Sequence, residues 1–463
     1  DSDWPDRAWR EVDAAGRPSW IAAASEGGTA LRAWQGWRSY EDSRAIVAAL
    51  LQAYVAACAL RPDAIVFNLS IGAWAGGHDP GSRGNRAIAA LGDAGARPGA
   101  PPTVVVAATG NAGADAGDVA GQVTPARPFR FAWSFTPWPA SMDGEAAACQ
   151  GAPSKLEIWA ACAGDLAIEI RLRGAGGRTV WRLPGTARGT SPVVTADGQL
   201  IGIVENRGAV RLGLRSVRII LHPSLPRPPL LGAAGCTFDV SVSEVGPSDG
   251  SEPSDGGPRC QSGAVHAWLE RDDTASASSS AVLHETCNKA GRSMGEKRLN
   301  SGLGLENGTL SGISCAPSVS SVAGLDQAVP TDTALALSGC GPQPWPDAES
   351  VPAPLLAAPA VRLFGARSKT LGYMHGTGTS AAAAMVSGAC ALALQAAGPN
   401  ARRFTEAGLM KALLGQDNAL LTGENWRPDI GFGALHFDAE VARIEFDRKA
   451  LSCASNKEQH FHE

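Results

Sequence analysis

Two short motifs, far apart in the chain, carry side chains that can act on a carbonyl group. Ser380 follows Gly-Thr and precedes small residues that predict a helix, and a helix N-terminus favours a developing negative charge. Asn111 follows the apolar run Thr103–Ala108, and an amide at the end of a buried strand can donate a hydrogen bond to a reacting carbonyl. Each motif alone also fits a structural role, Ser380 as the N-cap of a buried helix and Asn111 as a turn residue after glycine.

The segments around both motifs predict a sheet covered by helices. Apolar residues recur at helical spacing over residues 42–60, and the run 64–72 predicts a buried strand. A helical stretch near residues 85–95 precedes the strand-like run 103–108, and this order of strand, helix and strand predicts an α/β fold. The α/β pattern of strands and helices returns after residue 305, with candidate strands at 319–324 and 354–359 and candidate helices at 381–397 and 402–414.

Between these two parts the hydrophobic period changes to two. Residues 166–173 alternate apolar residues with mostly charged ones, which predicts a half-buried strand. Similar runs occur at 179–183, 200–204, 216–221, 238–242 and 265–269. Many short alternating strands predict a β-sandwich. We therefore predict an α/β domain in two pieces, 1–120 and 305–446, an inserted β-sandwich with loops at 121–304, and a tail at 447–463.

Composition narrows the classes of function. The 463-residue chain has a formal net charge of −5 and a pI of about 6.0, so neither a nucleic-acid surface nor a membrane surface is expected. No long apolar run predicts a transmembrane helix, and Asp1–Trp4 does not resemble the start of a signal peptide. The ten cysteines include no C-x-x-C pair, and their even number permits disulfides in an extracellular or periplasmic compartment. Cys58 and Cys390 lie in apolar helical stretches and are expected to be buried free thiols.

Together, and in this order, the two motifs resemble the subtilase family of serine proteases. Four further segments extend the resemblance, namely 67–72, 338–342, 354–359 and 429–433. It covers residues 30–111 and 305–445. The resemblance implies a three-layer α/β/α subtilisin-like fold with a parallel sheet, into which the β-sandwich, of jelly-roll type, is inserted.

The resemblance also implies a role for each matching residue. Ser380 would be the nucleophile, and the Asn111 side chain and the Ser380 N–H would form the oxyanion hole. An extended substrate backbone would pair with Ser70, Ile71 and Gly72. The side chain before the scissile bond would meet Ala108, Thr109 and Gly110. The implied partner is a polypeptide substrate. No cofactor is required, and calcium, although frequent in the family, has no matching carboxylate cluster in this sequence.

Several residues depart from the family pattern. Ala384-Met385 stands where a Pro-His pair is usual, and Ala360 stands where a glycine is usual, both at positions expected to pack near the site. The first histidine is His78, in a glycine-rich loop, where we expect it to be solvated. His375, five residues before Ser380, is expected to be a loop histidine.

The Asp and His of a serine-protease triad therefore have no match in this sequence. A serine nucleophile needs a base, and the base needs an orienting carboxylate. The favoured explanation is that the Asp and His lie upstream of residue 1, or on a segment or chain supplied separately. The alternative is a non-catalytic subtilase that acts as a peptide-binding or regulatory module.

Overall fold

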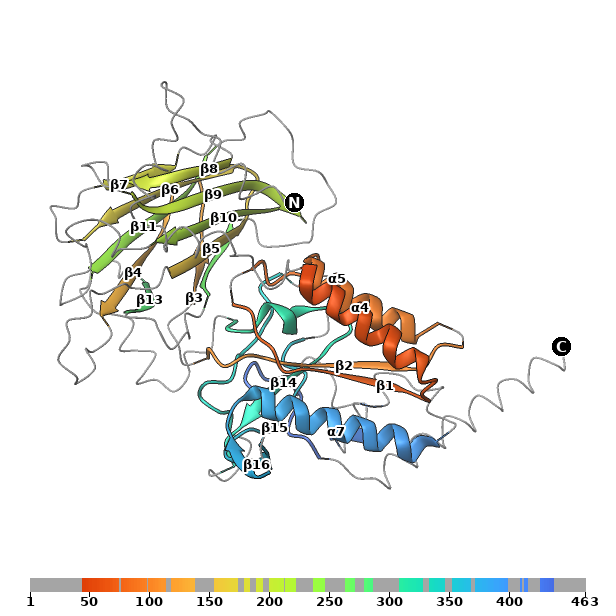
Figure 1. Ribbon diagram of the computed structural model, residues 1–463. Helices are drawn as coiled ribbons and strands as arrows, with labels where there is room; N and C mark the ends of the chain where they lie inside the picture. Colours follow the sequence, from red (N-terminus) through yellow and green to blue (C-terminus); the bar gives the residue numbers. More distant parts are fainter. Residues whose placement is uncertain are drawn as a thin grey trace. The chain divides into compact units, whose positions relative to one another are not determined.

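The computed structural model of the chain divides into two compact units (Figure 1). The α/β unit comprises Tyr40–Ala73, His78–Ala114 and Leu305–Glu463, and the β unit comprises Asp1–Ser39, Trp74–Gly77 and Asp115–Gly304. The residues that the structure describes are 44–74, 76–97, 99–113, 118–137, 154–173, 179–183, 189–194, 200–211, 213–221, 236–245, 263–270, 279–285, 308–327, 333–345, 352–367, 371–398, 409, 412–414 and 425–436. The predicted tail at 447–463 lies outside them.

A four-stranded parallel sheet forms the centre of the α/β unit. Its order is β1-β2-β14-β15, with β1 at Ile65–Leu69, β2 at Thr103–Ala108, β14 at Ser320–Leu325 and β15 at Leu356–Pro359. Helices α4 (Arg44–Ala59) and α5 (Arg83–Gly95) lie on one face of this sheet, and α7 (Thr379–Ala397) lies on the other (Figure 1). The prediction of a parallel sheet with helices is confirmed.

Strand β2 shows why the sheet is buried on both faces. Its side chains alternate, so Val104, Val106 and Ala108 pack in the core beneath α7. Val105 and Ala107 pack in the core beneath α4 and α5. A strand covered on both faces has no polar positions, which accounts for its uninterrupted apolar sequence.

Helix α7 is made of small and apolar residues and packs against all four strands. By length and composition it is apolar enough to cross a membrane, but its buried side, which includes Ala382, Val386 and Cys390, belongs to the core of the α/β unit. The predicted helix at 402–414 is described only at residues 409 and 412–414, which are helical. Two smaller elements complete this unit, the 3-10 turn η2 (Gly312–Cys315) and the hairpin of β16 (Leu363–Ala366) and β17 (Tyr373–Gly376).

The β unit consists of two antiparallel sheets. The first has the order β3-β12-β5-β10-β9-β8, with β3 at Asp118–Gln122, β12 at Ala264–Leu269, β5 at Ser154–Ala161, β10 at Leu214–Leu221, β9 at Leu200–Arg211 and β8 at Gly189–Val194. The second has the order β13-β4-β11-β6-β7, with β13 at Ser279–Glu285, β4 at Phe129–Pro137, β11 at Cys236–Val245, β6 at Asp165–Leu172 and β7 at Thr179–Leu183.

One hydrophobic core fills the space between these two sheets. Every second residue of a strand contributes to it, as with Ile158 on β5, Ile168 and Ile170 on β6, and Val240 on β11. The alternating strands predicted for this region are present, and the predicted run 166–173 is β6. The jelly-roll character of the unit and the exact predicted domain boundaries stay predictions.

Candidate active site

Three segments from different parts of the chain meet at one edge of the parallel sheet. Strands β1 and β2 are neighbours in parallel register, with Leu69 beside Ala107, so their carboxyl ends lie at the same edge. Ligands of open α/β sheets bind at such an edge. Ser70 follows β1, Asn111 follows β2, and the N-terminus of α7 brings Thr379 and Ser380 to the same place, as the hydrogen bonds below establish.

Thr379 joins the end of β2 to the start of α7. The Asn111 Oδ1 atom accepts hydrogen bonds from the Thr379 N–H and from the Thr379 hydroxyl, both at 2.9 Å. The same hydroxyl accepts a hydrogen bond from the Gly110 N–H at 3.2 Å. Thr379 is fully buried, so water cannot replace these bonds. Its contacts fix the orientation of the Asn111 amide through its oxygen.

Gly378 allows this close approach. It is the N-cap of α7 and has a φ of 143°, a backbone conformation that favours glycine. A side-chain carbon at this position would lie 3.1 Å from the Asn111 Nδ2 atom. The glycine before the Thr-Ser pair therefore keeps the space around the Asn111 amide open.

Ser380 is hydrogen-bonded to Ser70 in both directions. The Ser380 hydroxyl donates to the Ser70 carbonyl oxygen at 3.3 Å, and the Ser70 hydroxyl donates to the Ser380 carbonyl oxygen at 3.0 Å. Both residues are half-buried. The structure thus brings together Ser380, Asn111 and Ser70, which are far apart in the sequence.

The segment after Ser70 is held at its far end and open in its middle. Ala73 donates its N–H to the Ser311 hydroxyl at 2.9 Å and accepts a bond from the Gly312 N–H at 2.8 Å. Among the hydrogen bonds of the described residues, none involves the main-chain groups of Ile71 or Gly72. Such unpaired backbone is what strand addition by a substrate requires.

The predicted pocket residues Ala108, Thr109 and Gly110 are all buried. The Thr109 hydroxyl lies 3.3 Å from the Ser338 hydroxyl, and the Thr109 carbonyl oxygen accepts a bond from the Ser311 N–H at 2.7 Å. The side chain of Thr109 is therefore occupied by its neighbours. A role for this segment in binding substrate stays a prediction.

The histidines do not supply a base to Ser380 in the described part of the chain, where no imidazole is hydrogen-bonded to its hydroxyl. The expectation that His78 is solvated is wrong, because its exposed fraction is 0% and its φ is 49°. The glycine-rich loop packs against the protein instead of facing water. His375 is exposed in the β17 hairpin, with its Nδ1 atom 3.1 Å from the Arg362 carbonyl oxygen.

The positions that depart from the family pattern differ in their surroundings. Ala360 is fully buried, and its carbonyl oxygen accepts a bond from the Gly378 N–H at 2.9 Å, which confirms a packing role beside the site. Met385 is 45% exposed on the outer side of α7, so the expectation that it packs is wrong for the described part of the chain.

Sequence reasoning missed the two residues that tie the site together. Thr379 links Asn111 to α7, and Ser311 links the segment after β1 to the end of β2. The position of Thr379 directly before the serine was a usable signal, because the first residue of a helix has an unpaired N–H. Ser311 lies in a segment with no distinguishing pattern.

The comparisons with known proteins bear on this geometry. Residues 307–433, which include Ser380, match the model of the subtilase family. This segment of the chain is therefore similar to the subtilase family of serine peptidases. No curated protein sequence matches the chain.

The likeness of fold comes from a solved structure with a TM-score above 0.5. The structure of the Clostridium perfringens CspB protease matches this chain with a TM-score of 0.55 and 18% identity, over 86% of this chain and 69% of that chain. The Prenylagaramide maturation protease PagA matches with a TM-score of 0.21 and 20% identity, over 30% of this chain and 46% of that chain. The A-subunit of the AB5 toxin from E. coli matches with a TM-score of 0.20 and 24% identity, over 31% and 43% respectively.

Proposed function

We propose that this chain is a subtilase and acts as a serine-type endopeptidase, with Ser380 as nucleophile and Asn111 as side-chain donor of the oxyanion hole. One observation carries the proposal: Thr379, the residue before Ser380, donates two hydrogen bonds of 2.9 Å to the Asn111 Oδ1 atom and so fixes the Asn111 amide through its oxygen. An amide anchored through its oxygen presents its N–H groups on the other side. Preorganised donors of this kind stabilise an oxyanion because they need no rearrangement during the reaction.

The proposed reaction follows the acyl-enzyme route. A substrate strand pairs with Ser70–Gly72, and the Ser380 Oγ atom bonds to the scissile carbonyl carbon while its proton passes to a base. The carbonyl oxygen takes the electron pair and accepts hydrogen bonds from Asn111 Nδ2 and the Ser380 N–H. The C–N bond then breaks, and the base returns the proton to the leaving amine. Water then attacks the acyl ester and gives its proton to the base, and the base returns the proton to the Ser380 Oγ atom as the ester bond breaks.

The base is proposed to come from outside the residues described here. Family order places the Asp and His before the oxyanion Asn, and the resemblance leads us to propose that a segment upstream of residue 1, or a separate chain, carries them. By itself the Ser380 hydroxyl is a weak nucleophile at neutral pH. The chain alone should therefore hydrolyse peptides very slowly.

One observation favours a second candidate, a non-catalytic subtilase that binds peptides. The Ser380 hydroxyl donates its hydrogen bond to the main-chain oxygen of Ser70, and not to a side chain that could act as a base and take the proton. In this reading the open backbone of Ile71 and Gly72 binds a polypeptide strand that is never cleaved.

A fluorophosphonate probe separates the two candidates. The chain is treated alone and together with the upstream segment, with Ser380→Ala as the control for labelling elsewhere. The endopeptidase proposal predicts labelling at Ser380 only when the segment is present, and a labelling rate lowered about 10²–10³-fold by Asn111→Leu, the range measured for loss of this donor in subtilisin. Absence of labelling with an Asp- and His-bearing segment supports the binding module. Strong labelling of the chain alone would contradict an external base.

For the β unit we propose a jelly roll inserted into the subtilase fold. The strand orders β3-β12-β5-β10 and β4-β11-β6-β7 support this, because the consecutive strands β3, β4, β5 and β6 alternate between the two sheets. Alternation of this kind is what two Greek keys produce in a double sheet. An experimental structure with β5 and β6 in one sheet would refute the proposal.

A further inference from the structure

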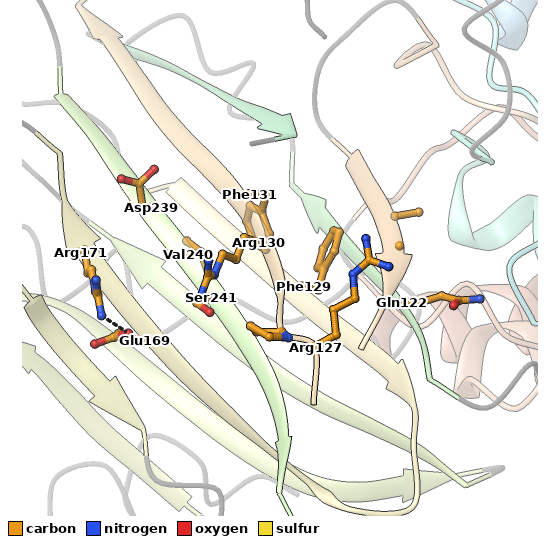
Figure 2. A pocket seen from close by; sticks show the side chains of 13 residues that line it. Gln122, Arg127, Phe129, Arg130, Phe131, Glu169, Arg171, Asp239, Val240 and Ser241 are labelled. Carbon is orange, nitrogen blue, oxygen red and sulfur yellow. Dashed lines mark hydrogen bonds and ion pairs between the residues drawn. The ribbon is translucent and has the colours of Figure 1, made fainter. Parts of the chain in front are cut away.

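A cavity of about 810 Å³ lies within the β unit (Figure 2). Its floor comes from β4, β11 and β6, and Gln122 of β3 and Arg127 of the turn before β4 stand on the opposite side from Glu169 and Arg171 in Figure 2. A volume of this size accommodates several side chains of a ligand and exceeds what a single small ion needs.

The floor of the cavity is polar because it is the outer face of a sheet whose inner face is the core. On β6 the core residues Ile168 and Ile170 are almost fully buried, so Glu169 and Arg171 point to the other face. Strand register aligns Arg130, Ser241 and Glu169 in one row across the sheet. Asp239 and Arg171 lie side by side in the next row.

Arginines outnumber carboxylates among the described residues of this face. Arg127, Arg130 and Arg171 line the cavity, and Arg173 lies beside it. The carboxylates are Glu169, which pairs with Arg171 at 2.8 Å, and Asp239, which pairs with Arg173. Among the described residues, these four guanidinium groups and two carboxylates have a formal charge of +2, which favours an anionic ligand.

The positions of the arginines are set by the backbone around them. Arg127 closes a turn in which its N–H and carbonyl oxygen both bond to Thr124 at 3.1 Å. Gly121 lets the Phe129 ring lie against β3, because a side-chain carbon there would be 2.5 Å from the ring. Glu169 holds the guanidinium of Arg171, whose side chain is nevertheless 50% exposed and so accessible to a ligand.

The spacing of the charges points to an extended chain. Arg130 on β4 and Arg171 on β6 are two strands apart, which corresponds to about 10 Å across the sheet. A polypeptide in the polyproline II conformation advances about 3.1 Å per residue with three residues per turn, so acidic side chains three residues apart lie on one side of the chain and match this separation. Guanidinium groups bind carboxylates through two parallel hydrogen bonds, which suits this pairing. Saccharides commonly stack on an exposed aromatic ring, and among the described lining residues the two aromatic ones, Phe129 and Phe131, are only 9% and 0% exposed.

We propose that this cavity binds an extended acidic segment of another polypeptide, with its carboxylates on Arg127, Arg130 and Arg171. The site is separate from Ser380 and does not depend on peptidase chemistry. In this proposal the β unit has a binding function of its own, because it captures an acidic region of another polypeptide.

The test measures binding of a fluorescent twelve-residue peptide, with glutamates at every third position, to the full chain by anisotropy. Arg127→Gln combined with Arg130→Gln should weaken binding at least tenfold, because charge-assisted hydrogen bonds are lost. The matched control is Arg97→Gln combined with Arg367→Gln, two exposed arginines of the α/β unit, which should change the dissociation constant less than twofold. Ser241→Trp should also weaken binding, since it fills the floor without changing the charge.

Several outcomes would overturn the proposal. One is equal binding of a peptide with glutamine in place of every glutamate, and another is equal weakening by the two double variants. A sulfated oligosaccharide that binds while the acidic peptide does not would assign the cavity to a different ligand class. Ser380→Ala should bind the peptide as the unaltered chain does, and loss of binding in that variant would mean that the peptide occupies the candidate active site instead. Thermal unfolding of each variant verifies that it is folded.

Discussion

The Thr379 anchor offers the sharpest test of how the candidate site is held together. Its hydroxyl donates to Asn111 Oδ1 at 2.9 Å and accepts from the Gly110 N–H at 3.2 Å, in a fully buried position. Thr379→Val keeps the shape of the side chain and removes only the hydroxyl. The bond from the Thr379 N–H to Asn111 is retained, so the variant isolates the role of the hydroxyl.

The expected effect is a loss of about 3–5 kcal/mol in the free energy of unfolding. Two hydrogen bonds of about 1 kcal/mol each disappear, and the buried Gly110 N–H is left without its acceptor, which adds about 1–3 kcal/mol. Thr379→Ser keeps both bonds and loses one methyl group, so it should cost only about 1 kcal/mol. The difference between the valine and serine variants therefore measures the anchor itself.

Urea unfolding followed by fluorescence gives the free energies, and hydrogen exchange at the Gly110 amide gives a local measurement. Exchange at this amide should become faster in Thr379→Val than in Thr379→Ser. The control is Thr377→Val, an exposed position where the hydroxyl accepts only the Arg362 N–H at 3.0 Å, with an expected loss of about 0.5 kcal/mol or less. Equal destabilisation by Thr379→Val and Thr377→Val would refute the proposed role of the Thr379 hydroxyl in holding the site together.

Further predictions concern other buried groups. Burial lowers the pKa of His266 from 6.5 to about 4, so between these pH values the unfolded chain binds a proton that the folded chain does not. The β unit should therefore lose about 3 kcal/mol of stability between pH 7 and pH 4 and none of it above pH 7, and His266→Phe should remove this part of the pH dependence in urea titrations. Burial raises the pKa of Cys390 to about 12, so its thiol should resist iodoacetamide at pH 8 until urea unfolds the chain, as mass spectrometry of the labelled peptide would reveal. Gly378→Ala should destabilise the α/β unit by about 1–3 kcal/mol, because alanine is strained at φ 143° and crowds Asn111; thermal unfolding unchanged from the parent would contradict this. Glu157→Ala should cost about 3–5 kcal/mol in urea unfolding, since it leaves the mostly buried Arg218 without its bond to Glu157, whereas Glu157→Asp should be milder.

The parallel sheet was predictable because burial on both faces leaves a plain signal. The apolar run Thr103–Ala108 coincides with β2, since the strand is covered by helices on each side and then stops at Gly110-Asn111. Helix α7 was predicted to begin at residue 381 and begins at Thr379. The error arose because Ser380 was treated as a residue before the helix, whereas Gly378 is the N-cap and Ser380 lies in the first turn.

Other features had no readable signal. The hairpin of β16 and β17 exposes Phe364 and Tyr373, at 67% and 68%, with their rings stacked 4.8 Å apart. Apolar residues that are exposed do not alternate with polar ones, so no period marked these strands. The burial of His78 depends on how its loop packs, which composition alone cannot reveal.

The bond between Ser380 and Ser70 is what connects the two candidate functions. The resemblance implied that Ser380 attacks a substrate strand that pairs with Ser70, but the exchange of hydrogen bonds between the two serines depends on the position of α7 relative to the end of β1. The Ser380 hydroxyl has one proton, and the Ser70 carbonyl oxygen holds it at 3.3 Å, near the long limit for an O–H donor. Such a hydrogen bond contributes about 1 kcal/mol or less to stability. An imidazole that enters this site can therefore replace the Ser70 carbonyl oxygen as the acceptor at little cost in free energy. A carbonyl oxygen cannot accept the proton fully, so without that imidazole the hydroxyl stays protonated and the site can only bind. The difference between an endopeptidase and a peptide-binding module therefore comes down to which group accepts this one proton.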